Sequence, residues 1–363
     1  DVAIRLRQRP GAVDLAILLD TSNSMDGLIS QAKSQLWTIV QQFADVEKDG
    51  GSPYLRVALF EYGNTDLPVN EGFIRQVVPL TDDLDVISEA LFALTTNGGD
   101  EYCGEVIDEA ITRLDWSDKR AAYRTIFIAG NEPFTQGSVD YEKACNRAAK
   151  QRIVVNTIHC GDQREGVHGR WKDGARLGKG EFFNIDQDRA VVYIPCPQDE
   201  IIIRLNNELN ETYLWYGSAD KRDLYCNNQK TQDFNAQSFS SSVAVSRSVI
   251  KSGKAYDNRS RDLVDALSSD ADILENVKEE ELPDAMQKMT PAERAVYLEE
   301  TKARRAELKQ QISEQAADRE MFLASERAKM AAETGDATLG DAVVIAIRKQ
   351  LQEAGFETVG QKK

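Results

Sequence analysis

A short polar turn after the first apolar segment constrains this chain more than any other feature. Residues 12–19 are mainly apolar, which is typical of a buried strand, and residues 28–43 carry apolar side chains at helical spacing. The sequence therefore predicts a strand, a tight turn and a helix in that order. The carboxyl edge of such a strand is where open α/β sheets bind ligands. The turn itself reads Asp20-Thr21-Ser22-Asn23-Ser24.

The side chains of this turn suit a hard divalent cation. Asp20 offers a carboxylate, and Ser22 and Ser24 offer hydroxyl oxygens at alternate positions. Mg²⁺ takes oxygen ligands and keeps several waters, so a set of this size is sufficient for it. Because one carboxylate does not neutralise a divalent ion, the ion would still attract an anionic oxygen from outside the chain. The alternative is an ordinary turn in which Ser and Asp cap the following helix.

The chain continues to about residue 210 as alternating strands and helices. The link at residues 63–68 contains Gly, Asn and Pro, which favours a hairpin between its neighbouring strands. Helices that alternate with apolar strands predict an α/β fold with a doubly wound, mostly parallel sheet. Further strands are predicted at 55–62, 73–80, 124–129, 154–160 and 181–185, and helices at 83–94, 103–114, 141–150 and 197–210.

The Asp-x-Ser-x-Ser turn, set in this order of elements, resembles the metal-ion-dependent adhesion site (MIDAS) of von Willebrand factor type A (VWA) domains. The resemblance implies a VWA domain with a Rossmann-like sheet at residues 12–215. It also implies that Asp20, Ser22 and Ser24 ligate a divalent metal. In this family a loop after a Gly pair supplies a further ligand, and here Asp100 follows the pair, as in a Gly-Gly-Asp variant.

One position departs from the family's pattern. The fourth strand of the family usually runs into Thr-Asp-Gly, whose Asp helps to hold the metal, whereas Gly130 stands at that place in this chain. Asn131 and Glu132 follow it and are the further candidates to supply an oxygen, directly or through water. If neither does so, the turn is a metal-free loop held by hydrogen bonds alone.

The charge and hydropathy of the chain exclude some partners. The chain of 363 residues has a formal net charge of −16 and a pI of about 4.8, which argues against binding to nucleic acid or to an anionic membrane. It has no apolar stretch of roughly 18 residues, so no membrane span is predicted. The chain opens on Asp1 and not on Met, which suggests a mature form after removal of a signal or propeptide, although a trimmed chain would look the same.

Cysteine usage leads to a prediction about the compartment. The chain has five cysteines without a Cys-x-x-Cys pair and only two histidines, so no zinc centre is predicted. An exported protein, periplasmic or secreted, would join some of these cysteines in one or two disulfides, and this is the interpretation that we favour. The alternative is a cytoplasmic protein with five buried thiols. The candidate disulfide cysteines are Cys103, Cys160, Cys196 and Cys226.

The last third of the chain, residues 232–363, is expected to be a helical extension. Thr290-Pro291-Ala292-Glu293 is a capping box that marks the start of a long helix, and without a heptad repeat this helix is expected to be a solvated helix or spacer arm. With its Gly-Asn-Glu-Pro-Phe loop and this extension, the whole chain resembles uncharacterised bacterial VWA proteins. Helices are predicted at 232–254, 259–267, 291–333 and 339–354, and a loop at 217–230.

The sequence lacks the motifs of common enzymes. A Gly-x-Ser-x-Gly nucleophile elbow and a phosphate-binding loop are both missing. A phosphatase of the haloacid dehalogenase type would need a second carboxylate two residues after Asp20, and Ser22 stands there. The chain is therefore interpreted as a protein that is not an enzyme.

The resemblance implies a protein-binding module. A partner protein would present an Asp or Glu to complete the cation site, with Mg²⁺ as the favoured ion and Ca²⁺ or Mn²⁺ as alternatives. The alternative function is an adaptor subunit of an ATP-driven chelatase or remodelling complex, and a metal-dependent hydrolase is a less favoured one. The sequence identifies neither the partner nor the oligomeric state.

Overall fold

The chain forms two compact units. The computed structural model describes residues 11–44, 46–49, 51–118, 121–185, 194–334 and 339–358. Unit 1 comprises Asp1–Tyr193 with Ala331–Lys363, and unit 2 comprises Ile194–Met330. The helix predicted at 197–210 therefore falls in unit 2, and the last helix of the chain falls in unit 1. The domains expected at 12–215 and 232–363 stay a prediction.

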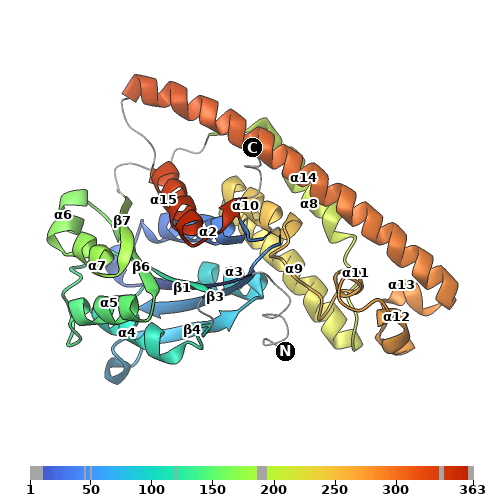
Figure 1. Cartoon of the computed structure of the whole chain (residues 1–363), viewed down its shortest axis with the longest axis horizontal. Helices are drawn as coiled ribbons and strands as arrows, with labels where there is room; N and C mark the ends of the chain where they lie inside the picture. The colour runs from blue at the N-terminus through green and yellow to red at the C-terminus, as the bar shows by residue number, and fades with distance from the viewer. Residues whose placement is uncertain are drawn as a thin grey trace. The chain divides into compact units, whose positions relative to one another are not determined.

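A six-stranded sheet forms the centre of unit 1 (Figure 1). Its strands are β1 (Ala12–Asp20), β3 (Tyr54–Tyr62), β4 (Ile74–Thr81), β5 (Tyr123–Gly130), β6 (Ile153–Cys160) and β7 (Lys179–Ile185). The strand order is β4-β3-β1-β5-β6-β7, and all neighbours are parallel except β4, which forms the predicted hairpin with β3. The doubly wound, mostly parallel α/β fold is thus confirmed. A separate antiparallel pair joins β2 (Val46–Glu47) to β8 (Glu357–Thr358).

Helices cover both faces of this sheet. Figure 1 shows α2 (Ile29–Ala44) and α15 (Leu339–Glu353) on one face, and α4 (Cys103–Arg113) and α5 (Tyr141–Lys150) on the other. Because both faces are covered, every residue of β1 and of β3 is buried, which explains the nearly continuous apolar run of β1. The other helices described in unit 1 are η1 (Asn23–Met25), η2 (Val69–Glu71), α3 (Leu84–Ala93), α6 (Gln163–His168) and α7 (Trp171–Leu177).

The connections place a topological switch point at the carboxyl end of β1. From β1 the chain passes to β3 and β4 on one side of the sheet and then returns to β5 on the other side. The strands that follow β1 in the chain thus lie first on one side of it and then on the other, and ligands of such sheets bind at the carboxyl end where this reversal occurs. Asp20 is the last residue of β1, Gly130 is the last residue of β5, and the two residues meet there.

Unit 2 is built from helices. The expected α8 (Pro197–Asn210) and long α14 (Pro291–Thr334) are present. The single helix predicted at 232–254 is instead divided at Ser240, whose backbone is extended, into the end of α9 (Ala219–Phe239) and α10 (Ser241–Ser252). The predicted capping box starts α14, because Glu293 Oε2 accepts a hydrogen bond from Thr290 N at 2.8 Å and Thr290 Oγ1 accepts one from Glu293 N at 3.4 Å. The other helices described are α11 (Leu263–Ala266), α12 (Ile273–Asn276), η3 (Glu279–Glu281) and α13 (Asp284–Gln287).

Two further expectations for unit 2 are wrong. The loop expected at 217–230 is helical from Ala219 onward, where it forms the first part of α9. This helix buries only Gln229, Gln232 and Ala236, so it has no apolar stripe that would predict it. The helix expected at 259–267 is reduced to α11, since Asp262 caps its first turn. None of the described helices has the length and apolarity that crossing a membrane requires.

Candidate functional site

Strand β1 carries two buried carboxylates, and only the one at its carboxyl end is incompletely paired. Asp14 accepts hydrogen bonds from Arg56 at 2.8 and 2.9 Å and from Ser117 N at 2.6 Å. Asp20 Oδ1 accepts a hydrogen bond from Ser22 N at 2.8 Å, whereas Asp20 Oδ2 is buried with no hydrogen-bond partner among the described residues. Burial raises the pKa of Asp20 to about 7, against the opposing effect of hydrogen bonds from Ser22 and from the Asn131 backbone. Burying a carboxylate oxygen without a hydrogen-bond partner is unfavourable unless a proton or a cation neutralises the group.

Hydrogen bonds that involve Ser22 and Ser24 connect Asp20 to the loop after β5. Ser22 Oγ and Ser24 Oγ lie 2.8 Å apart, and Ser24 Oγ donates to Asn131 Oδ1 at 2.9 Å. Asn131 Nδ2 in turn donates to the backbone oxygen of Ser24 at 3.3 Å. The structure therefore brings together Asp20, Ser22, Ser24 and Asn131, which the sequence placed in one site. Their oxygens are of the type that Mg²⁺ prefers.

A second buried carboxylate, Glu101, lies beside Asp20, although no motif in the sequence marks it as a site residue. Glu101 is only 4% exposed. Burial first and then the charge of Asp20 raise the pKa of Glu101 to about 7, while a hydrogen bond from the Ser22 side chain opposes the rise. Gly63 leaves room for both acids, because a Cβ there would lie 2.8 Å from Glu101 Cγ and 2.9 Å from Asp20 Oδ1. The site therefore contains two adjacent carboxylates and not one.

The other predicted acidic residues occupy the margin of this site. Asp100 is exposed and accepts a hydrogen bond from Tyr102 Oη at 3.2 Å, and no hydrogen bond between described residues joins it to Asp20. Glu132 is half-buried and accepts a hydrogen bond from Gln136 Nε2 at 3.3 Å, while its charge contributes to the raised pKa of Asp20. A metal role for either residue stays a prediction.

The structure explains why Gly130 departs from the family's pattern. A Cβ at position 130 would lie 2.5 Å from Tyr62 Oη and 3.0 Å from Asp20 Oδ2. Tyr62 Oη is held in place because it donates to the backbone oxygen of Ala129 at 3.1 Å. The tyrosine hydroxyl thus occupies the space that the family's aspartate would need.

We expect Gly130→Ala to lower the free energy of unfolding by about 1–3 kcal/mol, the usual range for overpacking a filled interior. Chemical denaturation followed by circular dichroism measures the change. Tyr62→Phe removes the hydroxyl that the new Cβ meets, so the same substitution should be less destabilising when it is made in a Tyr62→Phe background. An equal loss of stability in both backgrounds would show that this contact is not the cause.

The cysteines do not form the disulfides that the sequence permits. Cys103, Cys145, Cys160, Cys196 and Cys226 are all free thiols. They lie on separate elements and have other neighbours: Cys103 Sγ is 3.8 Å from Tyr62 Oη, and Cys196 Sγ donates to Gln198 Oε1 at 2.8 Å. Within the described residues, no group of three or more His, Cys, Asp or Glu is arranged to hold a metal. A cation at Asp20 would therefore depend on hydroxyl or amide oxygens as well.

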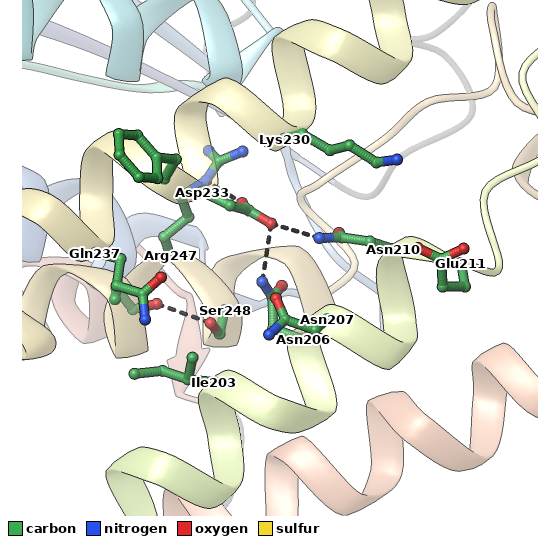
Figure 2. A pocket seen from close by; sticks show the side chains of 12 residues that line it. Ile203, Asn206, Asn207, Asn210, Glu211, Lys230, Asp233, Gln237, Arg247 and Ser248 are labelled. Atoms are coloured by element: carbon green, nitrogen blue, oxygen red, sulfur yellow. Dashed lines mark hydrogen bonds and ion pairs between the residues drawn. The ribbon is translucent and has the colours of Figure 1, made fainter.

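A separate pocket of about 300 Å³ lies within unit 2, between α8, α9 and α10 (Figure 2). Asp233 Oδ2 accepts hydrogen bonds there from Asn206 at 2.9 Å and from Asn210 at 2.7 Å. Asp233 also pairs with Arg247 at 2.6 Å and with Lys251 at 2.7 Å. Burial alone would raise the pKa of Asp233, but the two cations hold it well below its usual range. Both cations and both amide nitrogens are thus bound to Asp233, so the cluster links the three helices, although the buried Asn206 Oδ1 has no hydrogen-bond partner among the described residues.

Comparison with known families agrees with the fold. The family model described as the von Willebrand factor type A domain matches residues 14–168, so this part of the chain is a VWA domain. VWA domains are generally non-catalytic modules that often mediate protein–protein interaction. No match to the chain was found among curated proteins.

Three solved structures illustrate the likeness. The SpRpn10 VWA domain is 17% identical, with 50% of this chain and 91% of that chain covered and a TM-score of 0.39. BatB from Bacteroides thetaiotaomicron is 15% identical, with 61% and 98% covered and a TM-score of 0.38. Proximal thread matrix protein 1 from the mussel byssus, with a zinc-occupied MIDAS motif, is 15% identical, with 50% and 43% covered and a TM-score of 0.37.

Proposed function

We propose that unit 1 binds a protein partner through a divalent cation held at Asp20. The observation that carries this proposal is the buried Asp20 Oδ2, which has no hydrogen-bond partner among the described residues and lies at the switch point of the sheet. Asp20, Ser22 and Ser24 would hold the cation, with Asn131 beside them. The bound ion would neutralise the buried charge and offer a coordination position to an Asp or Glu of the partner.

The donor set favours a hard cation. Its groups are carboxylate, hydroxyl and amide oxygens, which suit Mg²⁺ best and also accept Ca²⁺ or Mn²⁺. The thiols nearest to the site do not compete for the ion, because burial raises the pKa values of Cys103 and Cys160 and keeps both protonated. Asp100 and Glu132 remain marginal candidates in this proposal.

One observation favours the adaptor of an ATP-driven chelatase or remodelling complex as a second candidate function. All five cysteines are free thiols, as is usual in a reducing cytoplasm. An extracytoplasmic location, which we predicted from the sequence, would expose any accessible thiol to oxidation. Cys226 is the cysteine to examine, because it is partly exposed whereas the other four are buried.

Titration calorimetry of the metal-free protein with Mg²⁺, Mn²⁺ and Ca²⁺ tests the proposed function. We expect saturable binding by the wild type and none by Asp20→Ala, because this substitution removes the anchoring carboxylate. Glu89→Ala is the matched control, since Glu89 is an exposed carboxylate on α3 and its loss should leave binding unchanged. Binding that survives in Asp20→Ala, or is missing from the wild type, would contradict the proposal. Partner capture in Mg²⁺ and in EDTA then tests whether the protein interaction needs the same carboxylate.

A further inference from the structure

We propose that Glu101 is the second anchoring carboxylate of this site. It supplies the negative charge that the family's aspartate would supply at position 130, where this chain has glycine. The inference rests on the proposed function, because it concerns a ligand of the same cation. It moves the expected acidic ligand of the Gly-Gly loop by one residue, from Asp100 to Glu101. The site then holds its ion between the turn after β1 and the loop before α4.

The loop before α4 is fixed over the Asp20 turn by backbone contacts. Asn97 N donates to Thr21 O at 2.9 Å, and Thr65 N donates to Gly98 O at 2.5 Å. Gly99 lies so close to Gly63 that a Cβ on Gly99 would stand 2.1 Å from the Gly63 backbone oxygen. These contacts need no metal, so the loop is already in place to present its next side chains.

Two neighbouring acids of this loop, Asp100 and Glu101, lie in different environments: Asp100 is exposed and Glu101 is buried. Glu101 N donates to Gln136 Oε1 at 3.3 Å, and the Glu101 side chain is buried against Asp20 and Ser22. The Asp100 carboxylate instead remains exposed beside Tyr102 Oη. Of the two acids, only Glu101 is therefore buried beside the Asp20 carboxyl group, since Glu101 Cγ and Asp20 Oδ1 both flank the place that a Cβ on Gly63 would take.

The charges of the pair point to a divalent cation as the missing partner. Among the described residues, no lysine or arginine forms an ion pair with Asp20 or with Glu101, whereas Asp14 on the same strand is paired with Arg56 at 2.8 Å. Two adjacent buried carboxylates are unfavourable when both are ionised without a cation between or beside them. A single divalent ion supplies the two positive charges that balance them. Ser22 forms a hydrogen bond with each acid, through its backbone N with Asp20 and through its side chain with Glu101.

The neighbouring pair Glu101 and Asp100 gives a matched test of this assignment. Titration of Glu101→Gln with Mn²⁺ should show a dissociation constant raised about tenfold or more, since a lost interaction at a metal site commonly has this effect. Asp100→Asn, which removes the same charge from the adjacent residue, should change the constant by less than about twofold. At the same Mn²⁺ concentration, the melting temperature of the wild type and of Asp100→Asn should rise more than that of Glu101→Gln, because the weaker site is stabilised less. The melting curve of Glu101→Gln in EDTA shows that the isosteric variant is folded.

The outcomes separate this inference from the proposed function. If the wild type binds no metal, the proposed function itself fails. If the wild type binds Mn²⁺ and Glu101→Gln binds it equally well, the proposed function stands and the assignment of Glu101 is wrong. If Asp100→Asn alone loses affinity, the ligand is Asp100, as the sequence suggested.

Discussion

Arg305→Met should lower the free energy of unfolding of unit 2 by about 3–5 kcal/mol, because it leaves buried carboxylates without their cation. Arg305 is 3% exposed, and its guanidinium bonds both oxygens of Asp262 at 2.6 and 3.0 Å. It also reaches Asp265 Oδ1 at 2.9 Å and Thr212 Oγ1 at 3.1 Å, and it lies over the ring of Tyr213. Arg305 thus links α14 to the residues Thr212, Asp262 and Asp265 of the neighbouring segments.

Urea denaturation followed by far-ultraviolet circular dichroism measures this effect. Arg304→Met is the matched control, because Arg304 is the preceding residue on the same helix but pairs with Glu208 and Glu307 at the surface. Surface ion pairs contribute little, so the control should change stability far less. Adding Asp262→Asn to Arg305→Met should restore part of the loss, since it removes one unpaired charge. Equal effects of the Arg304 and Arg305 substitutions would contradict this account of the buried cluster.

The fold of unit 1 could be predicted because buried parallel strands and capped helices leave clear patterns. β1 and β3 read as continuous apolar runs since helices cover both faces of the sheet. Helix α9 left no such pattern, because two of its three buried residues are the glutamines Gln229 and Gln232. The association of α15 with unit 1 could not be predicted either, because the sequence indicates an apolar face on that helix but does not identify the surface that it packs against.

The candidate site could be predicted in part for the same reason. Asp20 and its serines share one turn, so their proximity follows from local sequence. Glu101 could not be chosen over Asp100, because both follow the same Gly pair. The choice depends on how Gly99 packs against Gly63 and on the Gln136 contact, and both are long-range features. The one signal in the sequence was the adjacent Asp-Glu pair itself.

Asp20→Asn should make the metal-free protein more stable above about pH 7 and change it little near about pH 4. Burial raises the pKa of Asp20 to about 7 in the folded protein, from 3.8 when it is solvated. A raised carboxyl pKa contributes stability that is fully present below the unfolded value and is lost as the pH rises through the folded value. The shift of about three units corresponds to about 4 kcal/mol as an upper limit. Glu101, whose pKa is also raised, adds a contribution of the same sign.

Urea denaturation in EDTA across this pH range tests the expectation. The free energy of unfolding of the wild type should fall as the pH rises, and that of Asp20→Asn should fall less, because asparagine keeps the shape of the side chain but does not ionise. Glu89→Gln, on the exposed face of α3, should follow the wild type. Saturating Mg²⁺ should restore the wild type at high pH and leave Asp20→Asn unchanged, since the cation binds the ionised carboxylate. A wild type whose stability is flat across this range would mean that Asp20 is not held uncompensated, and the main physical reason for a cation at this site would disappear.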